Sequence, residues 1–254
     1  MLTIQERHQY ILDRLEKEGF VRVQDLADAL GVTGATIRND FRTLESRHLL
    51  YRNHGSATPV KKKVIDLPVH EKSAMQVSEK KRIALAAINL LEEDDSIIMT
   101  SGTTIEAMAM NIKPKGHLNV VTPSIRVGVY LSEKEDVDVL MLGGQVIKNS
   151  LSVRDSYTLD GLRNVKCSKL FLSCDGFDLE AGLTSAFVEE ARITNAMMGA
   201  ATEIILLADS SKYRKVGFGK ICDFSSIDVL VTDSGISQSV LDRLEADGIT
   251  VIVA

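Results

Sequence analysis

The chain has few cysteines and none of the long apolar runs that typify secreted or membrane proteins. Among its 254 residues are only three cysteines, Cys167, Cys174 and Cys222. Their odd number and wide spacing exclude a disulfide framework and a paired-cysteine zinc site. No apolar run approaches the ~18 residues that a membrane span needs. The opening MLTIQERHQY lacks the apolar stretch of a secretory signal. We therefore expect a cytoplasmic protein without a membrane partner. The histidines lack the spacing of metal ligands, and neither a metal site nor a cofactor is expected.

Charge is unevenly distributed along the chain, although the overall composition is ordinary. Hydrophobic residues make up 44% and charged residues 26%, which is enough for one large domain or two smaller ones. Residues 1–63 hold 11 Lys and Arg against 8 Asp and Glu, whereas the remainder holds 19 against 27. A basic start on an acidic body favours a small nucleic-acid-binding module attached to a larger domain.

The first fifty residues show the periodicity of three short helices. Apolar residues recur at helical spacing over 5–18, 24–30 and 34–48. Gly19 closes the first helix and Gly31 supplies the backbone freedom that a tight turn requires. Thr33 is placed to cap the third helix. The pattern predicts a helix-turn-helix.

Polar residues suited to DNA lie on the outward face of the third predicted helix. Arg can bond guanine, Asn can bond adenine and Thr can meet a thymine methyl group. A hairpin signal follows, with Asn53-His54-Gly55 as its turn, so the next segment can act as a wing. The alternative is an amphipathic helical pair with a solvated polar face. The residues predicted to contact DNA are Thr33, Thr36, Arg38, Asn39, Arg42, Arg52 and His54.

Residues 58–73, TPVKKKVIDLPVHEKS, have two prolines, three consecutive lysines and no apolar periodicity. They are predicted to be a linker. The lysines could follow a DNA phosphate track or be part of a solvated tether, and both interpretations stay open.

Beyond residue 73, short apolar runs alternate with helical patterns. The runs include SIIMT, NVVT, VDVLML, KLFLSC, EIILLA, DVLVT and ITVIVA, and helical patterns span 78–91, 104–111, 124–133, 188–201 and 237–246. This alternation predicts an α/β domain with a mostly parallel sheet.

Small and polar residues follow several of these runs. In open α/β sheets, ligands bind beyond the carboxyl ends of the strands, so these clusters should converge. Hydroxyls at a helix N-terminus suit a phosphate, carboxylates suit sugar hydroxyls, and a lysine adds positive charge. Ordinary turns with capping hydroxyls are the alternative for each cluster taken alone. The residues predicted on these grounds to bind an anionic effector are Thr100, Ser101, Gly102, Thr103, Thr104, Gly143, Asp175, Gly176, Asp178, Asp209 and Lys212.

Five motifs occur in order between residues 7 and 57, and their spacing matches one family pattern without insertions or deletions. They are Arg-x-x-x-Ile-Leu, Val-x-x-Leu-Ala, Gly-Val-Thr, Thr-Ile-Arg-x-Asp-x-x-x-Leu-Glu and a closing His-Gly. This series resembles the DNA-binding head of the DeoR family of bacterial transcription regulators. The resemblance implies a winged helix-turn-helix over 1–57 whose residues Thr36, Arg38, Asn39 and Arg42 face DNA.

The resemblance extends to about residue 232. It is carried by Ser-Gly-Thr-Thr, Leu-Gly-Gly, Cys-Asp-Gly-Phe-Asp, Gly-Leu-Thr, Glu-Ala and Ala-Asp-Ser-Ser-Lys-Tyr. It implies an effector-binding and oligomerisation domain over 74–254, similar in fold to ribose-5-phosphate isomerase. The family commonly has an acidic residue where Thr100 stands and a glycine where Arg154 stands. These departures either favour an anion, which adds Arg154 to the residues predicted to bind the effector, or mark a different effector geometry.

Three functions are compatible with the features of the whole chain. A sugar-phosphate isomerase would use Asp175 or Asp178 as general base, but LEAGLTSAFVEEAR lacks the glycine-rich loop that follows the acidic pair in those enzymes. A ligand-free oligomerisation scaffold is the second possibility. The favoured function is a non-enzymatic regulator, by resemblance a repressor of a carbohydrate operon. Its partners would be operator DNA, a phosphorylated sugar and further copies of the chain in a dimer or tetramer.

Overall fold

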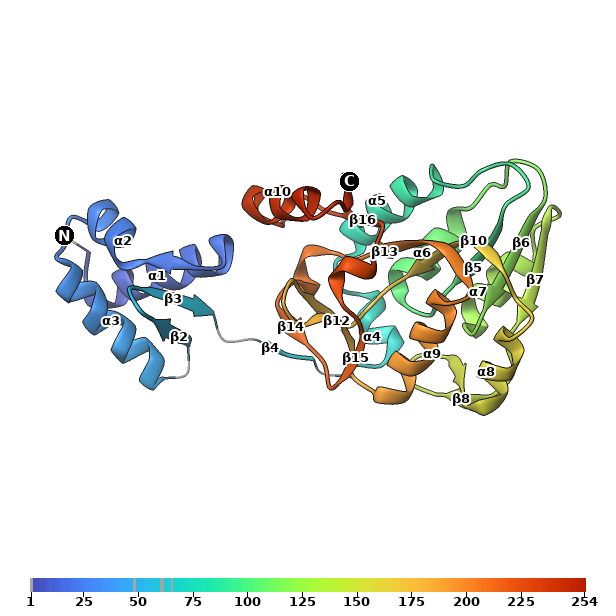
Figure 1. The fold of residues 1–254 in the computed structure, drawn as a ribbon, viewed down its shortest axis with the longest axis horizontal. Helices are drawn as coiled ribbons and strands as arrows, with labels where there is room; N and C mark the ends of the chain where they lie inside the picture. The colour runs from blue at the N-terminus through green and yellow to red at the C-terminus, as the bar shows by residue number, and fades with distance from the viewer. Residues whose placement is uncertain (1, 48, 60–61, 65) are drawn as a thin grey trace. The chain divides into compact units, whose positions relative to one another are not determined.

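The computed structural model describes residues 2–47, 49–59, 62–64 and 66–254 (Figure 1). The chain forms two units, Met1–Lys62 and Lys63–Ala254, called here the head and the body. The end of the helix predicted over 34–48 falls on residue 48, and the predicted linker includes residues 60, 61 and 65. These positions lie outside the described residues.

The head is a winged helix-turn-helix. Its helices are α1 (Ile4–Glu18), α2 (Val23–Leu30) and α3 (Gly34–Ser46). Its antiparallel sheet has the order β1-β3-β2 and consists of β1 (Val21–Arg22), β3 (Ser56–Pro59) and β2 (Leu50–Asn53). The helices meet over the apolar positions that the periodicity identified, which include the buried Ile11, Leu15, Leu26, Ile37, Phe41 and Leu44.

Two glycines give the head its turns. Gly31 ends α2 with a φ of 62° and Gly55 joins β2 to β3 with a φ of 78°. A residue with a Cβ would be strained in this left-handed region. Thr33 caps α3, because its hydroxyl accepts a hydrogen bond from the Thr36 N–H at 3.2 Å. The hairpin turn predicted at Asn53-His54-Gly55 lies between β2 and β3, whereas the pairing of β1 with β3 was not predicted.

The body is built on a seven-stranded sheet in which all neighbouring strands are parallel. The strands in spatial order are β17 (Thr250–Val253), β16 (Val229–Thr232), β13 (Ala201–Leu207), β10 (Cys167–Leu172), β5 (Ser96–Met99), β6 (Leu118–Thr122) and β7 (Val137–Met141). The predicted α/β class with a mostly parallel sheet is confirmed.

Helices pack on both faces of this sheet (Figure 1). Alternate residues of one strand point to opposite faces, so Ile97 and Met99 join one core and Ile98 joins the other. The first core includes α5 (Val77–Ile88), α6 (Thr103–Asn111) and α7 (Ile125–Ser132); the second includes α8 (Ser156–Leu162), α9 (Val188–Met198) and α10 (Gln238–Ala246). None of the helices in the described ranges is long and apolar enough to cross a membrane.

Smaller sheets and short helices complete the body. One sheet has the order β11-β12-β15, and two further pairs are β8-β9 and β14-β4. Their bounds are β4 (Lys62–Lys63), β8 (Gln145–Ile147), β9 (Ser152–Arg154), β11 (Gly176–Asp178), β12 (Gly182–Ser185), β14 (Lys215–Val216) and β15 (Gly219–Cys222), and the short helices are α4 (Val69–Ser73), η1 (Ser210–Lys212) and η2 (Phe224–Ser226).

The segment predicted as a linker contains regular structure at both ends. β3 continues to Pro59 within the head, and α4 occupies the last five residues of the segment. Val69 of α4 is buried, and its N–H donates to the Asn149 carbonyl at 2.7 Å. The difference arises because α4 is too short to show a helical period in the sequence.

Candidate functional site

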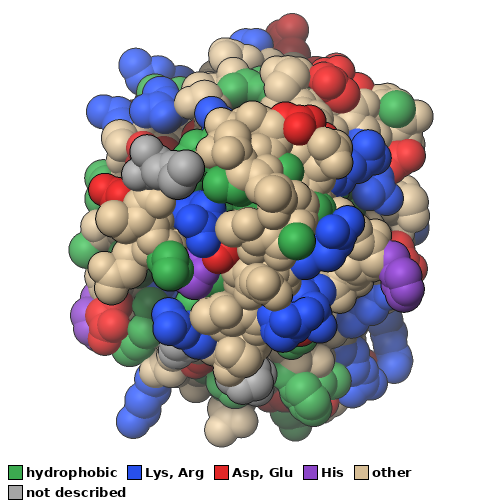
Figure 2. Space-filling view, turned by 90° about the vertical axis from the view of Figure 1, so that its left-hand side faces the viewer, with side chains coloured by type: hydrophobic (Ala, Val, Ile, Leu, Met, Phe, Trp, Pro, Cys, Tyr) green, Lys and Arg blue, Asp and Glu red, His purple; other side chains and the backbone are tan. Residues whose placement is uncertain are grey.

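The outward face of α3 carries most of the side chains predicted to contact DNA. Arg38, Asn39 and Arg42 are exposed, and Thr36 is half-buried. Arg42 donates to the Asn39 side-chain oxygen at 2.9 Å, so these two residues already form a pair that can present donors to a groove. Figure 2 shows Lys and Arg side chains at several places on one face, interrupted by uncharged atoms. Lys and Arg side chains are therefore spread over this face rather than gathered in one patch.

Arg52 and His54 lie in the wing. Arg52 donates through its backbone N–H and its Nε to the Glu45 carboxylate, at 3.1 and 2.5 Å. This pair ties β2 to α3 and uses part of the hydrogen-bonding capacity of Arg52. His54 is exposed in the hairpin turn. Thr33 is exposed, and its hydroxyl is engaged in capping α3.

A buried ionic cluster fastens α1 to the back of α3. Asp40, which is 5% exposed, accepts from Arg7 Nε at 2.6 Å and from Arg7 Nη2 at 2.9 Å. The His8 ring lies 3.0 Å from the same carboxylate. The hydrogen bond from Arg7 to Asp40 raises the pKa of the Arg7 guanidinium, so Arg7 stays charged. Asp40 is one of two acidic residues in α3, and the local sequence pattern does not indicate that it pairs with α1.

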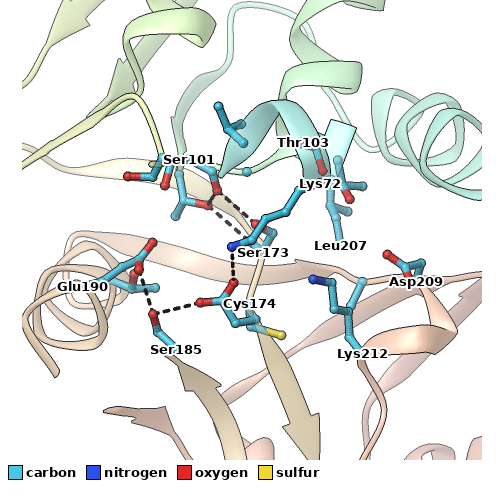
Figure 3. A pocket seen from close by; sticks show the side chains of 18 of the residues that line it. Lys72, Ser101, Thr103, Ser173, Cys174, Ser185, Glu190, Leu207, Asp209 and Lys212 are labelled. Carbon is cyan, nitrogen blue, oxygen red and sulfur yellow. Dashed lines mark hydrogen bonds and ion pairs between the residues drawn. The ribbon is translucent and has the colours of Figure 1, made fainter. Parts of the chain in front are cut away.

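Polar residues from several strand ends surround one cavity of about 60 Å³ in the body (Figure 3). Its lining includes eight of the predicted effector residues, namely Thr100, Ser101, Gly102, Thr103, Thr104, Asp175, Asp209 and Lys212. They follow β5, β10 and β13, which are neighbours in the sheet. The expected convergence at one sheet edge therefore holds for three of the four clusters.

The loop between β5 and α6 forms one wall of the cavity. Gly102, with a φ of 128°, is the N-cap of α6, and no side chain caps this helix end. A Cβ on Gly102 would lie 2.2 Å from Ser173 Oγ, so only glycine fits. Thr100 Oγ1 accepts from the Ser173 N–H at 3.1 Å. The loop thus directs hydroxyls and helix N–H groups towards the cavity, which suits an anion.

An ion pair crosses the cavity. Lys72 of α4 donates from Nζ to Asp175 Oδ1 at 2.8 Å (Figure 3). Burial disfavours ionisation of Asp175, but the Lys72 charge and the Ala186 N–H outweigh it and hold the pKa of Asp175 below its usual value. Burial likewise opposes the charge of Lys72, yet Asp175 raises the pKa of Lys72. Both groups are therefore charged at neutral pH.

Ser185 links Asp175 to a second buried carboxyl group. Its Oγ lies 3.2 Å from Asp175 Oδ2 and 2.8 Å from Glu190 Oε2. Burial and the neighbouring Asp175 charge raise the pKa of Glu190. A hydroxyl has one proton to donate. Protonated Glu190 can donate to Ser185 while Ser185 donates to Asp175, and this order satisfies all three groups.

Two further lysines face the cavity. Lys80 of α5 is 6% exposed and donates to the Lys72 carbonyl at 2.5 Å. Burial lowers the pKa of Lys80 to about 8. Lys212 lies in η1, whose N-cap Asp209 accepts from the Ser211 N–H at 3.1 Å. The lining therefore combines three lysines with carboxyl groups and hydroxyls.

Four predicted effector residues do not line the cavity. Asp178 accepts from the Glu180 and Ala181 N–H groups at 3.1 and 3.0 Å, and so shapes the turn between β11 and β12. Gly176 permits close packing, since a Cβ there would lie 2.3 Å from the Lys215 carbonyl. The Gly143 carbonyl accepts from Thr158 at 2.7 Å. Arg154 stacks on Phe187, with its guanidinium carbon 4.6 Å from the ring centre.

Several lining residues were not predicted from the sequence as effector contacts. These are Val69, Lys72, Lys80, Asn149, Ser150, Ser173, Cys174, Ser185, Glu190, Thr194, Leu207, Ala208 and Ile221. Lys80 could have been found, because it shares a helical stripe with the buried Ile83, Ala84 and Ala87. A lysine within an apolar stripe indicates a buried amine. Lys72 carried no comparable signal.

The three cysteines are free and buried. Burial raises the pKa of Cys167, and it raises the pKa of Cys222 to about 11. Their thiols are therefore protonated and packed as small apolar groups. In the part of the chain that the structure describes, no cluster of three or more His, Cys, Asp or Glu side chains is arranged to hold a metal.

A winged head followed by an α/β body with a polar cavity defines a two-domain DNA-binding regulator. The model of the DeoR-like helix-turn-helix domain matches residues 7–63, and that of the DeoR C terminal sensor domain matches residues 75–234. The chain therefore belongs to the DeoR family of transcriptional regulators, as the motifs predicted. Regulators of this family, rather than enzymes, are its relatives.

Two relatives span nearly the whole chain. The uncharacterized HTH-type transcriptional regulator YulB of Bacillus subtilis is 34% identical over 96% of this chain and 94% of its own length. The putative aga operon transcriptional repressor of Escherichia coli O157:H7 is 34% identical over 98% of this chain and 93% of its own. Among solved structures, ribose 5 phosphate isomerase A from Neisseria gonorrhoeae has a TM-score of 0.37 and 18% identity, covering 53% of this chain and 52% of that one.

Proposed function

We propose that this regulator represses a carbohydrate operon and that a phosphorylated sugar, bound in the body cavity, controls its binding to operator DNA. The observation that carries the proposal is the gathering of Lys72, Lys80 and Lys212 around a hydroxyl-lined helix N-terminus. The name of the related aga operon repressor supports the repressor assignment. The protein would act in the cytoplasm, where the operator is.

The chemistry of the lining favours a phosphate joined to a polyol. Hydroxyls and helix N–H groups of the 100–104 loop can donate to phosphate oxygens, and lysine ammonium groups balance the charge. The carboxylates of Asp175 and Asp209 can accept from sugar hydroxyls. The cavity is thus suited to hold a sugar phosphate.

The head would read DNA through α3. Arg38, Asn39 and Arg42 would contact bases in the major groove, with Thr33, Thr36, Arg52 and His54 at its edges. One small head buries limited surface, so useful affinity requires at least two heads held together by the bodies of a homo-oligomer. The effector would act by binding better to one of two arrangements of such an assembly.

The DNA arm of the test starts from duplexes that the wild-type protein selects from a random library. Arg38→Ala should weaken binding to the selected duplex about 5- to 150-fold, the range for losing one specific base contact. Arg163→Ala, an exposed substitution in the body, should leave it unchanged. Normal binding by Arg38→Ala would refute the assignment of α3 as the reading helix.

The effector arm uses thermal unfolding with triose, pentose and hexose phosphates. A specific sugar phosphate at a hundredfold excess over its Kd should stabilise the body by about 2.7 kcal/mol. Lys212→Ala should reduce this stabilisation and leave DNA binding intact, whereas the exposed Lys81→Ala should change neither. If no member of the panel stabilises the protein, the body is better described as an oligomerisation scaffold.

A further inference from the structure

The helix α4 is the first helix of the body that the chain reaches after leaving the head. Two hydrogen bonds attach this segment to the β8–β9 region. The Val69 N–H donates to the Asn149 carbonyl at 2.7 Å, and the Asn149 side-chain amide donates to Asp66 at 2.8 Å. Asn149 also lines the cavity. The segment that joins the head to the body is thus held by a residue that an effector would touch.

The opposite end of α4 is attached by lysines of the cavity. Lys72 pairs with Asp175, and Lys80 donates to the Lys72 carbonyl at the end of the helix. The Lys72 and Asp175 side chains remain 23% and 14% exposed. A pair with this much access to water is cheaper to separate than a fully buried one. The Lys72–Asp175 pair is therefore an attachment that can be exchanged for another charged partner.

The enclosed part of the cavity is small. A volume of about 60 Å³ corresponds to about four to six water molecules at ~10–15 Å³ each. Inorganic phosphate fits in this space, but a pentose phosphate has more than twice as many non-hydrogen atoms. The Lys72 side chain crosses the cavity between the 100–104 loop and Asp175 (Figure 3). Its displacement would enlarge the space.

We propose that Lys72 is the gate of the cavity and the residue that transmits effector binding to the tether of the head. The effector phosphate takes over Lys72 as its counter-charge, Asp175 turns to the sugar hydroxyls, and α4 loses its ion pair with Asp175. This inference rests on the proposed function, since it requires an anionic effector in the same cavity. It identifies the residue through which occupancy changes the segment between the two units.

Amide hydrogen exchange over residues 66–73 tests the gate without an identified effector. Lys72→Met and Asp175→Asn should each accelerate exchange of this segment about fivefold, the effect of losing one partly exposed ion pair. Lys72→Arg keeps the charge and should stay near the wild-type rate. The matched control Lys81→Met removes an exposed lysine of α5 and should have no effect. Wild-type exchange in Lys72→Met would overturn the proposal.

Inorganic phosphate separates this proposal from the proposed function. Added to the wild type, phosphate should raise the melting temperature of the body and accelerate exchange over 66–73; in Lys72→Met the rate should already be high and should not rise further. A raised melting temperature with unchanged exchange would reject the gate and leave the effector site standing. If neither phosphate nor the sugar phosphates stabilise the body, both proposals fail.

Discussion

Ser185 has one hydroxyl proton and two carboxyl neighbours, Asp175 and Glu190. Burial favours the neutral form of Glu190, which supplies the missing proton. A single residue therefore sets the charge of the cavity. With Glu190 neutral, the three lysines outnumber the two aspartates of the lining, Asp175 and Asp209, and an anion is attracted rather than repelled.

The neutral state of Glu190 can be tested with Glu190→Gln, which keeps the shape and lacks the acid. The pKa of Glu190 is raised in the folded protein above the ordinary 4.5, so the folded state binds the extra proton between these values. The free energy of unfolding of the wild type should therefore fall relative to Glu190→Gln as pH rises above about 4.5. Denaturant unfolding at a series of pH values measures the difference, and the opposite slope would mean that Glu190 is ionised.

Gly102 allows a second residue-scale prediction. Gly102→Ala would place a methyl group against Ser173 and a Cβ at a φ of 128°. Strain of this kind costs about 1–3 kcal/mol, and displacing Ser173 from the Ser101 carbonyl forfeits about 1 kcal/mol more. Gly143→Ala is the control, because nothing lies within 4 Å of the added Cβ. Its effect should be within about 0.5 kcal/mol. Equal stability of the two variants in chemical denaturation would contradict this account.

The residues of the cavity were predictable where two signals coincided. The 100–104 loop combined hydroxyls and glycine with a strand-to-helix junction, and it lines the cavity. Asp178 has a carboxylate that suits sugar hydroxyls and is close in sequence to Asp175. Its carboxylate, however, accepts hydrogen bonds from backbone N–H groups of the turn that follows it. Lys72 was missed because its position depends on tertiary contacts of a five-residue helix. Local sequence patterns carry no information on such contacts.

At the scale of elements, α1 and α3 depend on the Asp40 cluster for their relative position. Helix boundaries agreed with the periodicity to within about two residues in the head, since each helix has glycine or threonine at an end. The strands of the large sheet were equally clear from their apolar runs. The small strands β8, β9, β11, β12 and β15 are only three or four residues long, too short for a period of two to be recognised.

The Asp40 cluster makes the head sensitive to one substitution. Asp40→Asn would leave the part-buried Arg7 without its counter-charge, which costs up to about 3–5 kcal/mol. A unit of this size has a total stability of about 3–9 kcal/mol. Asp40→Asn should therefore unfold much of the head and abolish binding to the selected duplex. The exposed Asp28→Asn on α2 should change stability by less than about 0.5 kcal/mol. Proton NMR of the head resonances would reveal a folded Asp40→Asn head, the result that would contradict us.

At the scale of the whole molecule, the two units have separate hydrophobic cores. The core of the head consists of residues between Ile11 and Ala57, and the cores of the body begin at Ile83. The charge asymmetry of the sequence indicated this division, and the family models follow it closely. No sequence pattern indicated that the end of the predicted linker is a helix bearing a cavity residue. The segment that joins the head to the body therefore carries a residue, Lys72, that lines the cavity.

Separate cores predict two unfolding transitions in calorimetry, one for each unit. An effector that binds only in the body should raise the body transition by the free energy of about 2.7 kcal/mol at a hundredfold excess over Kd, and leave the head transition in place. The selected duplex should do the reverse. Asp40→Asn should remove the head transition while the body keeps its effector-dependent shift, which assigns each transition to its unit. A single transition that both ligands shift equally would instead mean that the head and the body unfold as one cooperative unit, and α4 could not then act as a tether that loosens independently.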